Sequence, residues 1–255
     1  MRVAALQVDT VWEDAAATCR RIEPWIATAA AGGAGLAVLP EMFACGFSMN
    51  TAKIAEPVDG PTTTFLRDQA AKYGLWLGGT VPEQTADRPA NVFVLAGPGG
   101  EIHRYKKIRP FTPSGEKAAF EAGTETLTIE IPDGDAALRI SLFVCYDLRF
   151  ADLFWDLAPS TDLYLVAANW PETRSRHWKA LLDARAIENQ AFVLGVNRVG
   201  TGGNLKYTGD SRIVSPLGEE LGAAASVETV LFAEVTAERV AQVRRDLPFL
   251  ADRPG

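Results

Sequence analysis

Three residues whose side chains can do chemistry follow apolar runs or predicted strands. Cys145 and Glu41 each come at the end of an apolar run, and Lys107 leaves a predicted strand for a long loop. A thiol can act as a nucleophile, a carboxylate can move a proton, and an ammonium group can stabilise developing negative charge. Because strand ends of open α/β folds hold side chains rigidly at a crevice, these residues are candidates for one catalytic site.

Each of the three residues also has an ordinary structural explanation. A lone cysteine in a strand is usually a small core residue. A glutamate after a proline usually complements the dipole at the start of a helix, and a lysine is usually a solvated surface cation. The catalytic interpretation therefore depends on the three residues occurring together.

Activation of the cysteine by histidine has little support in this sequence. A thiol with the ordinary pKa of ~8.5 is mostly protonated at neutral pH, so the nucleophile needs a base. The two histidines are His103, predicted on a strand and facing outward, and His177, near the start of a helix. We therefore expect the carboxylate of Glu41 to take the place of histidine.

No motif for a metal or a cofactor is present in the sequence. There is no CxxC pair, no closely spaced set of histidines and cysteines, and no GxGxxG after a strand. Zinc sites and dinucleotide sites depend on such patterns. We expect an enzyme that uses neither a metal nor an organic cofactor.

Three dispersed motifs resemble those of the carbon–nitrogen hydrolase (nitrilase) superfamily. They are the segments 39–43 around Glu41, 105–111 around Lys107 and 144–150 around Cys145. The order and spacing of the three residues match, and the resemblance covers essentially the whole chain. It implies a four-layer α-β-β-α sandwich that pairs sheet faces between subunits, and hence a homodimer or a larger homo-oligomer.

Within this superfamily the sequence is most similar to the ω-amidases, which hydrolyse the side-chain amide of 2-oxoglutaramate and similar monoamides of dicarboxylates. The similarity lies in the segments 41–49, 169–171, 174–190, 197–200 and 207–211. The resemblance implies hydrolysis of a linear amide through a cysteine thioester, with release of ammonia. The expected substrates are small monoamides of the 2-oxoglutaramate and 2-oxosuccinamate type.

The resemblance also implies a role for each candidate residue. Cys145 is the nucleophile and Glu41 the base. Lys107 and the backbone N–H of Tyr146 stabilise the oxyanion of the tetrahedral intermediate.

A second glutamate is expected beside the lysine. Glu116 resembles the second glutamate of the family, which would hold Lys107 and the substrate nitrogen. Glu121 is the alternative for this role, and the spacing of the motif favours Glu116.

Because the expected substrates carry a carboxylate, we expect a cation at the far end of the pocket. Arginine is the favoured cation, since it binds carboxylates in a bidentate manner. Arg149 and Arg174 are the candidates, although Arg149 could instead form a structural ion pair with Asp147 or Glu188. The aromatic candidates for the pocket wall are Phe43, Phe47 and Trp170. Core packing is the alternative explanation for these three residues, above all for Phe47.

Composition excludes several other classes of protein. The 255 residues have a formal net charge of −7 and contain no long run of Lys and Arg, so nucleic acid is not an expected partner. No apolar stretch approaches the ~20 residues needed to cross a bilayer, and no secretory signal is recognisable. The three cysteines form no paired framework, which suits a reducing compartment. We expect a cytoplasmic protein.

The elements that must position these residues form one mixed α/β domain over 1–255. Helices are predicted over 15–31, 61–73 and 175–189, with a short helix from 237. Strands are predicted over 3–8, 36–39, 75–81, 91–96, 101–105, 127–131, 138–144, 163–168 and 192–196. A late hairpin is predicted to pair 212–214 with 230–235, and 108–123 is predicted to be a long functional loop.

Two other kinds of function stay open on the sequence alone. The same chemistry could act on another substrate, as in an N-carbamoyl amino acid hydrolase, a nitrilase or an amidase for deaminated glutathione. The chain could also be a non-catalytic binding subunit. A binding subunit has no use for an intact set of Glu41, Lys107, Glu116 and Cys145, so we favour the enzyme.

Overall fold

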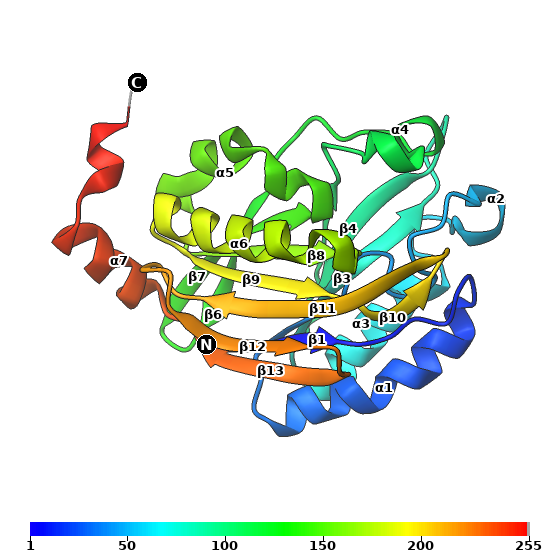
Figure 1. The fold of residues 1–255 in the computed structure, drawn as a ribbon. Coiled ribbons are helices and arrows are strands. Elements are labelled where there is room, and N and C mark those ends of the chain that lie inside the picture. Colours follow the sequence, from blue (N-terminus) through cyan, green and yellow to red (C-terminus); the bar gives the residue numbers. More distant parts are fainter. Residues whose placement is uncertain (254–255) are drawn as a thin grey trace.

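The computed structural model describes residues 1–253, which form two β-sheets packed face to face between layers of helices (Figure 1). This arrangement confirms the predicted four-layer α-β-β-α sandwich. All four layers come from one chain, because strands of the first sheet contact strands of the second. The two sheets therefore pair face to face within one chain, and pairing between subunits stays a prediction.

The first sheet carries the segments that lead to Glu41 and Lys107. Its strands β1, β2 and β3 are parallel, and the outer pairs are antiparallel. The order is β13 (Thr229–Glu234), β1 (Arg2–Gln7), β2 (Leu36–Val38), β3 (Trp76–Glu83), β4 (Ala90–Ala96) and β5 (Ile102–Lys106).

The second sheet carries the segment that leads to Cys145. Strands β7, β8 and β9 are parallel, so their carboxyl ends meet at one edge. The order is β10 (Val199–Gly202), β11 (Leu205–Val214), β9 (Phe192–Asn197), β8 (Leu163–Ala168), β7 (Ala136–Val144) and β6 (Thr128–Asp133), with β12 (Glu220–Ala225) paired to β11.

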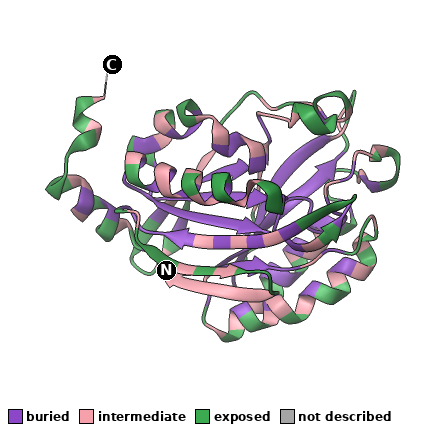
Figure 2. Ribbon diagram, viewed as in Figure 1, coloured by how far each residue is buried: buried purple, intermediate pink, exposed green. Residues whose placement is uncertain are grey.

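Alternating side chains explain why the central strands are apolar throughout. In β1, Val3 and Ala5 point to the core between the sheets, whereas Ala4 and Leu6 point to the core under the helices. Residues of a strand alternate between faces, so a strand buried on both faces needs a continuous apolar run. Figure 2 shows the central strands buried along most of their length.

Helices close the two outer faces. Helix α1 (Ala15–Ala31) begins at Asp14, whose carboxylate accepts a hydrogen bond from the backbone N–H of Ala17 (2.9 Å). Helices α1 and α3 (Pro61–Tyr73) cover the first sheet, and α6 (Ser175–Asn189) covers the second. The remaining helices are α2 (Thr51–Ile54), α4 (Glu116–Ala119), α5 (Ala151–Leu157) and α7 (Ala237–Asp246).

The predicted helices over 15–31, 61–73 and 175–189 are confirmed with the same bounds. The predicted late hairpin is wrong: β13 pairs with β1, and β12 is the hairpin partner of β11. Strand β12 contains glycine and alanine in place of the β-branched residues that mark a strand, so its sequence gives little strand signal. Within residues 1–253, no helix has both the length and the apolar character needed to span a membrane.

Candidate active site

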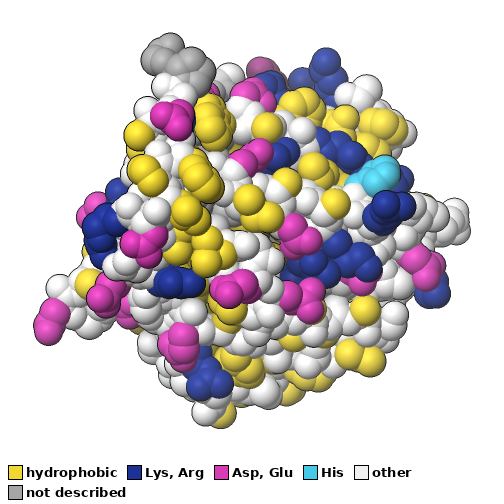
Figure 3. Space-filling view, turned by 60° about the vertical axis from the view of Figure 1, so that its left-hand side comes forward, with side chains coloured by type: hydrophobic (Ala, Val, Ile, Leu, Met, Phe, Trp, Pro, Cys, Tyr) yellow, Lys and Arg dark blue, Asp and Glu magenta, His cyan; other side chains and the backbone are white. Residues whose placement is uncertain are grey.

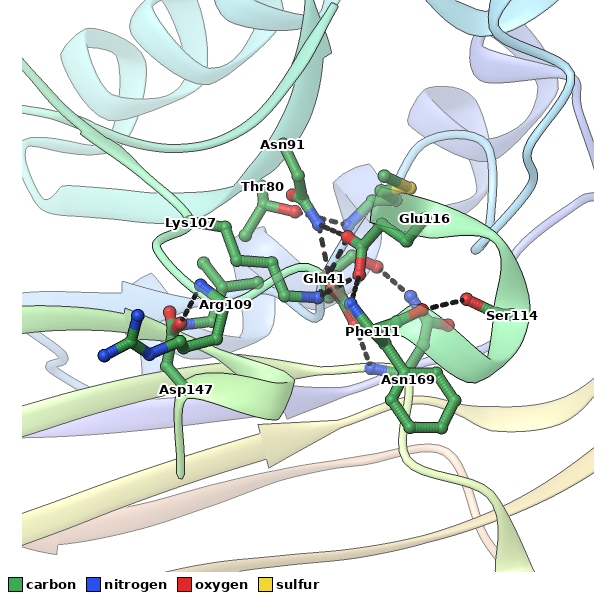
Figure 4. A network of polar contacts seen from close by, with 12 residues as sticks. Glu41, Thr80, Asn91, Lys107, Arg109, Phe111, Ser114, Glu116, Asp147 and Asn169 are labelled. Atoms are coloured by element: carbon green, nitrogen blue, oxygen red, sulfur yellow. Dashed lines mark hydrogen bonds and ion pairs between the residues drawn. The ribbon is translucent and has the colours of Figure 1, made fainter. Parts of the chain in front are cut away.

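A buried lysine stands between two buried glutamates at the strand ends of the first sheet. Lys107 Nζ lies 2.8 Å from Glu41 Oε1 and 2.8 Å from Glu116 Oε2. Figure 4 shows the lysine reaching between the two carboxylates. None of the three side chains is more than 1% exposed, so the structure brings the predicted glutamate, lysine and second glutamate together.

Asn91 and Asn169 hold the carboxylate of Glu41. Asn91 Nδ2 donates to Glu41 Oε1 (2.8 Å) and also to Glu116 Oε1 (3.1 Å). The backbone N–H of Asn169, just after β8, donates to Glu41 Oε2 (2.9 Å), and its side-chain amide donates to the Glu41 carbonyl. Glu41 is therefore fixed by donors from both sheets.

The electrostatics of this cluster keep the lysine cationic. Burial alone would lower the pKa of Lys107, but the carboxylates of Glu116 and Glu41 outweigh burial and raise that pKa well above its ordinary value. A lysine that stays protonated cannot act as a base. It can hold the glutamates and stabilise negative charge on a substrate oxygen.

Cys145 occupies a strained turn at the end of β7. Its φ is +44°, in the left-handed region that non-glycine residues seldom adopt. It begins a short 3₁₀ helix, Cys145–Arg149, and the N–H of Tyr146 in the first turn has no acceptor within that helix. Cys145 is 8% exposed and lines a cavity. The turn thus presents a nucleophile and a backbone donor side by side.

The thiol of Cys145 needs a base to become a nucleophile. Burial raises its pKa well above the ordinary value, the carboxylate of Glu41 raises it further, and Lys107 opposes them. The histidines have other partners: His103 stacks on Trp76 with ring centroids 5.8 Å apart, and His177 contacts Arg149 (3.2 Å). Glu41 is the carboxylate whose charge acts most strongly on the thiol.

The structure distinguishes the two candidates for the second glutamate. Glu116 accepts hydrogen bonds from Lys107 and from the backbone N–H of Phe111 (2.5 Å). Glu121 instead pairs with Lys106 (2.6 Å) and accepts from Thr85. Only Glu116 of these two contacts Lys107, which agrees with the preference for Glu116.

A cavity of about 270 Å³ opens above Cys145 and contains both predicted arginines. The guanidinium of Arg149 lies 4.8 Å from the ring centroid of Trp170, and that of Arg174 lies 5.2 Å from the ring centroid of Phe111. Over residues 1–253, neither arginine has a carboxylate within 4.0 Å. Two cations with aromatic neighbours and no acidic partner are suited to bind an anion.

The alternative of a structural ion pair for Arg149 is wrong. Glu188 pairs with Arg185 (2.7 Å), and Asp147 accepts hydrogen bonds from Tyr105 and from backbone groups. Arg149 is left to face the cavity beside Trp170.

The structure contradicts the predicted position of Phe43 on the pocket wall. Phe43 is fully buried in the core under α1 and α3, packed so closely on Gly79 that a Cβ there would lie 2.7 Å from the Phe43 ring. The pocket is lined instead by Phe47, whose ring centroid is 5.4 Å from Lys107 Nζ. Met42, with φ of +42°, breaks the alternation after β2, so the strand period does not extend to either phenylalanine.

Several residues of the site carry no strong signal in the sequence. Asn91 is a single polar residue at the start of an apolar strand, and its burial beside two carboxylates becomes visible only in the fold. Trp12 and Tyr207 also line the cavity, from a loop after β1 and from β11. A lone asparagine in an otherwise apolar strand that leads toward the lysine motif is the one sequence signal that points to Asn91.

Known proteins resemble this chain over most of its length. The family model described as "Carbon-nitrogen hydrolase" matches residues 2–245. The chain is 37% identical to omega-amidase YafV of Escherichia coli K12, over 99% of this chain and 96% of that protein. It is 36% identical to a 2-oxoglutaramate amidase of Paenarthrobacter nicotinovorans, over 87% of this chain and 79% of that protein.

Solved structures of similar proteins carry adducts in their active sites. XC1258 from Xanthomonas campestris, with an arsenic adduct in the active site, is 36% identical with a TM-score of 0.93 and covers 100% of this chain and 97% of that one. A variant of the amidase from Nesterenkonia sp. AN1, with acrylamide added to its active-site cysteine, is 26% identical with a TM-score of 0.83, over 97% of this chain and 98% of that one.

Proposed function

This chain belongs to the carbon–nitrogen hydrolase family and is an amidohydrolase, and we propose that it cleaves small ω-amides that carry a distal carboxylate, with 2-oxoglutaramate the first candidate. One observation carries the substrate class: a single cavity joins the Cys145 thiol to Arg149 and Arg174, which have no acidic partner within residues 1–253. An amide at one end and a carboxylate at the other fit such a cavity.

The first half of the proposed reaction forms a thioester. Glu41 takes the thiol proton while the sulfur of Cys145 bonds to the amide carbon. Negative charge on the substrate oxygen is stabilised by Lys107 and by the N–H of Tyr146, and losing one such donor typically costs about 3 kcal/mol of transition-state stabilisation. The C–N bond then breaks, Glu41 returns the proton to nitrogen, and ammonia leaves.

The second half hydrolyses the thioester. Glu41 takes a proton from water as the water oxygen attacks the acyl carbon, the C–S bond breaks, and the proton returns to the sulfur. The products are the carboxylic acid, ammonia and free enzyme. Glu116 holds Lys107 throughout, and its position at 2.8 Å from Lys107 Nζ supports this role.

The substrate class is tested by ammonia release from a panel of compounds. The panel contains 2-oxoglutaramate, succinamate, glutamine and asparagine, together with a nitrile and an N-carbamoyl amino acid. We expect the highest kcat/KM with the oxo-amide. Higher activity on glutamine, on the nitrile or on the carbamoyl compound would overturn the substrate class, and no ammonia from any compound would favour a binding subunit.

The oligomeric state and the compartment belong to the same proposal: a homodimer or larger homo-oligomer in the cytoplasm. All three cysteines are free, which suits a reducing compartment. Figure 3 shows hydrophobic side chains gathered near the C-terminal end of the chain, and exposed apolar patches often mark interfaces. The C-terminal part of the chain exposes Leu217, Leu221, Leu247 and Phe249. Light scattering coupled to size-exclusion chromatography measures the mass of the assembly.

A further inference from the structure

Asp147 is a buried carboxylate that the reaction described above does not use. It lies two residues after Cys145 and is fully buried. Its Oδ2 accepts hydrogen bonds from the Tyr105 hydroxyl (2.8 Å) and the Val144 N–H (3.0 Å), and its Oδ1 accepts from the Arg109 N–H (2.8 Å). Figure 4 shows Asp147 beside Arg109.

The three donors come from the two segments that carry the lysine and the nucleophile. Tyr105 and Arg109 stand two residues before and two residues after Lys107, and Val144 directly precedes Cys145. Across residues 1–253, every hydrogen bond between 105–109 and 144–149 ends on Asp147. One carboxylate therefore links the Lys107 segment of the first sheet to the Cys145 turn of the second.

The same carboxylate closes the strained turn. The hydrogen bond from Val144 N–H to Asp147 spans Cys145 and Tyr146, the residues that present the thiol and the backbone donor. A residue with positive φ keeps that conformation only where its surroundings enforce it. The contacts of Asp147 supply such enforcement on both sides of Cys145.

We propose that Asp147 is a positioning residue that fixes the Cys145 turn relative to Lys107 and so sets the reactivity of the thiol. The proposal rests on the proposed function for its effect on turnover, but its effect on the thiol is independent of any substrate. An ionised carboxylate accepts from all three donors, whereas an amide places its own N–H groups against one of them. Burial raises the pKa of Asp147 to about 6, which leaves it ionised at neutral pH.

The test compares two buried aspartates. Asp162 is also buried; it directly precedes β8 and does not line the cavity. Its carboxylate accepts three hydrogen bonds from Arg139. Asp147→Asn and Asp162→Asn each leave hydrogen-bond donors poorly matched to the new amide, so both should lower the Tm. Only Asp147→Asn should lower kcat in the folded enzyme, by about 100-fold with KM nearly unchanged, because small displacements of reacting groups are costly.

Alkylation of Cys145 by iodoacetamide gives a readout without substrate. Burial raises the pKa of Cys145 and Lys107 opposes that rise, so loosening the link to Lys107 should raise the pKa further and slow alkylation at neutral pH by about tenfold. Asp162→Asn should alkylate at the wild-type rate. If Asp147→Asn does not fold, Tyr105→Phe removes one of the three hydrogen bonds and should slow both kcat and alkylation by a few fold.

Unchanged alkylation and kcat in Asp147→Asn, or in Tyr105→Phe if the former is unfolded, would overturn the positioning role. So would equal losses in Asp162→Asn, because they would show general destabilisation. A wild-type enzyme that releases no ammonia from any amide contradicts the proposed function alone, and the alkylation rates still decide the role of Asp147.

Discussion

The wall of the cavity and the charged cluster next to it, called the floor, are built in different ways. The floor consists of Glu41, Asn91, Lys107 and Glu116, which are buried behind the residues that line the cavity and are joined by hydrogen bonds of 2.8 to 3.1 Å. The wall is held by cation–ring contacts near 5 Å and by edge-on or tilted ring contacts; its residues are Trp12, Phe47, Phe111, Arg149, Trp170 and Arg174. A rigid charged floor suits the reaction, and a looser aromatic wall suits choice of substrate. Changes to the floor should lower kcat, and changes to the wall should raise KM.

The largest effect is expected for Glu41→Gln on the floor. Loss of the base should lower kcat by about 1,000-fold, since general base catalysis is typically worth a factor of 100 to 10,000. Lys107 keeps Glu116 as its partner, so the fold should persist. Ammonia release measures turnover and circular dichroism checks the fold. A kcat within tenfold of wild type would show that another group takes the proton.

A smaller effect on kcat is expected for Asn91→Ala. The change removes one donor from both buried carboxylates, and an unsatisfied buried group costs about 1–3 kcal/mol, which corresponds to about 5- to 150-fold in rate. Asn189→Ala is the matched control, because Asn189 is equally buried on α6 but bonds to the Arg185 carbonyl. Steady-state kinetics should show a loss of kcat in Asn91→Ala alone; equal kcat in the two variants contradicts the role given to the floor.

On the wall, Arg174→Ala should raise KM by about tenfold for an amide with a carboxylate, because a hydrogen bond to a charged group is worth about 1.5–3 kcal/mol. The kcat should change little. An uncharged amide such as butyramide serves as the control and should show no change in KM. If KM rises equally for both amides, Arg174 does not bind the carboxylate, and the same comparison in Arg149→Ala tests the second arginine.

The smallest effect on catalysis is expected at the two phenylalanines. Phe43→Leu should lower the free energy of unfolding by about 1 kcal/mol and leave KM unchanged, because Phe43 lies in the core. Phe47→Leu should leave stability nearly unchanged and raise KM by a few fold, because Phe47 lines the cavity. Urea unfolding and steady-state kinetics separate the two outcomes, and the reverse pattern would contradict the distinction between core and wall.

The sequence predicts the floor better than the wall, for a physical reason. Glu41, Lys107 and Cys145 each stand at the end of a strand, so the strand pattern and the motifs place them at one edge of the fold. Phe43 and Phe47 lie in an irregular loop after β2, where no period says which side chain faces the cavity. Asn91 depends on contacts with two distant segments, and those contacts exist only after the sheets form.

The order of the strands shows the same limit. The helices over 15–31, 61–73 and 175–189 follow from local patterns and are predicted with their bounds. The pairing of β13 with β1 joins the two ends of the chain, and a local pattern favours a hairpin between sequence neighbours instead. Long-range pairing is therefore where the prediction of the late hairpin is wrong.

The central claim is that Cys145 is the nucleophile, and a comparison of two buried cysteines tests it most directly. Cys45 is 4% exposed, burial raises its pKa to about 12, and it does not line the cavity. Ammonia release from 2-oxoglutaramate should be undetectable in Cys145→Ala and close to wild type in Cys45→Ala, with both proteins folded. Full activity in Cys145→Ala would contradict the account.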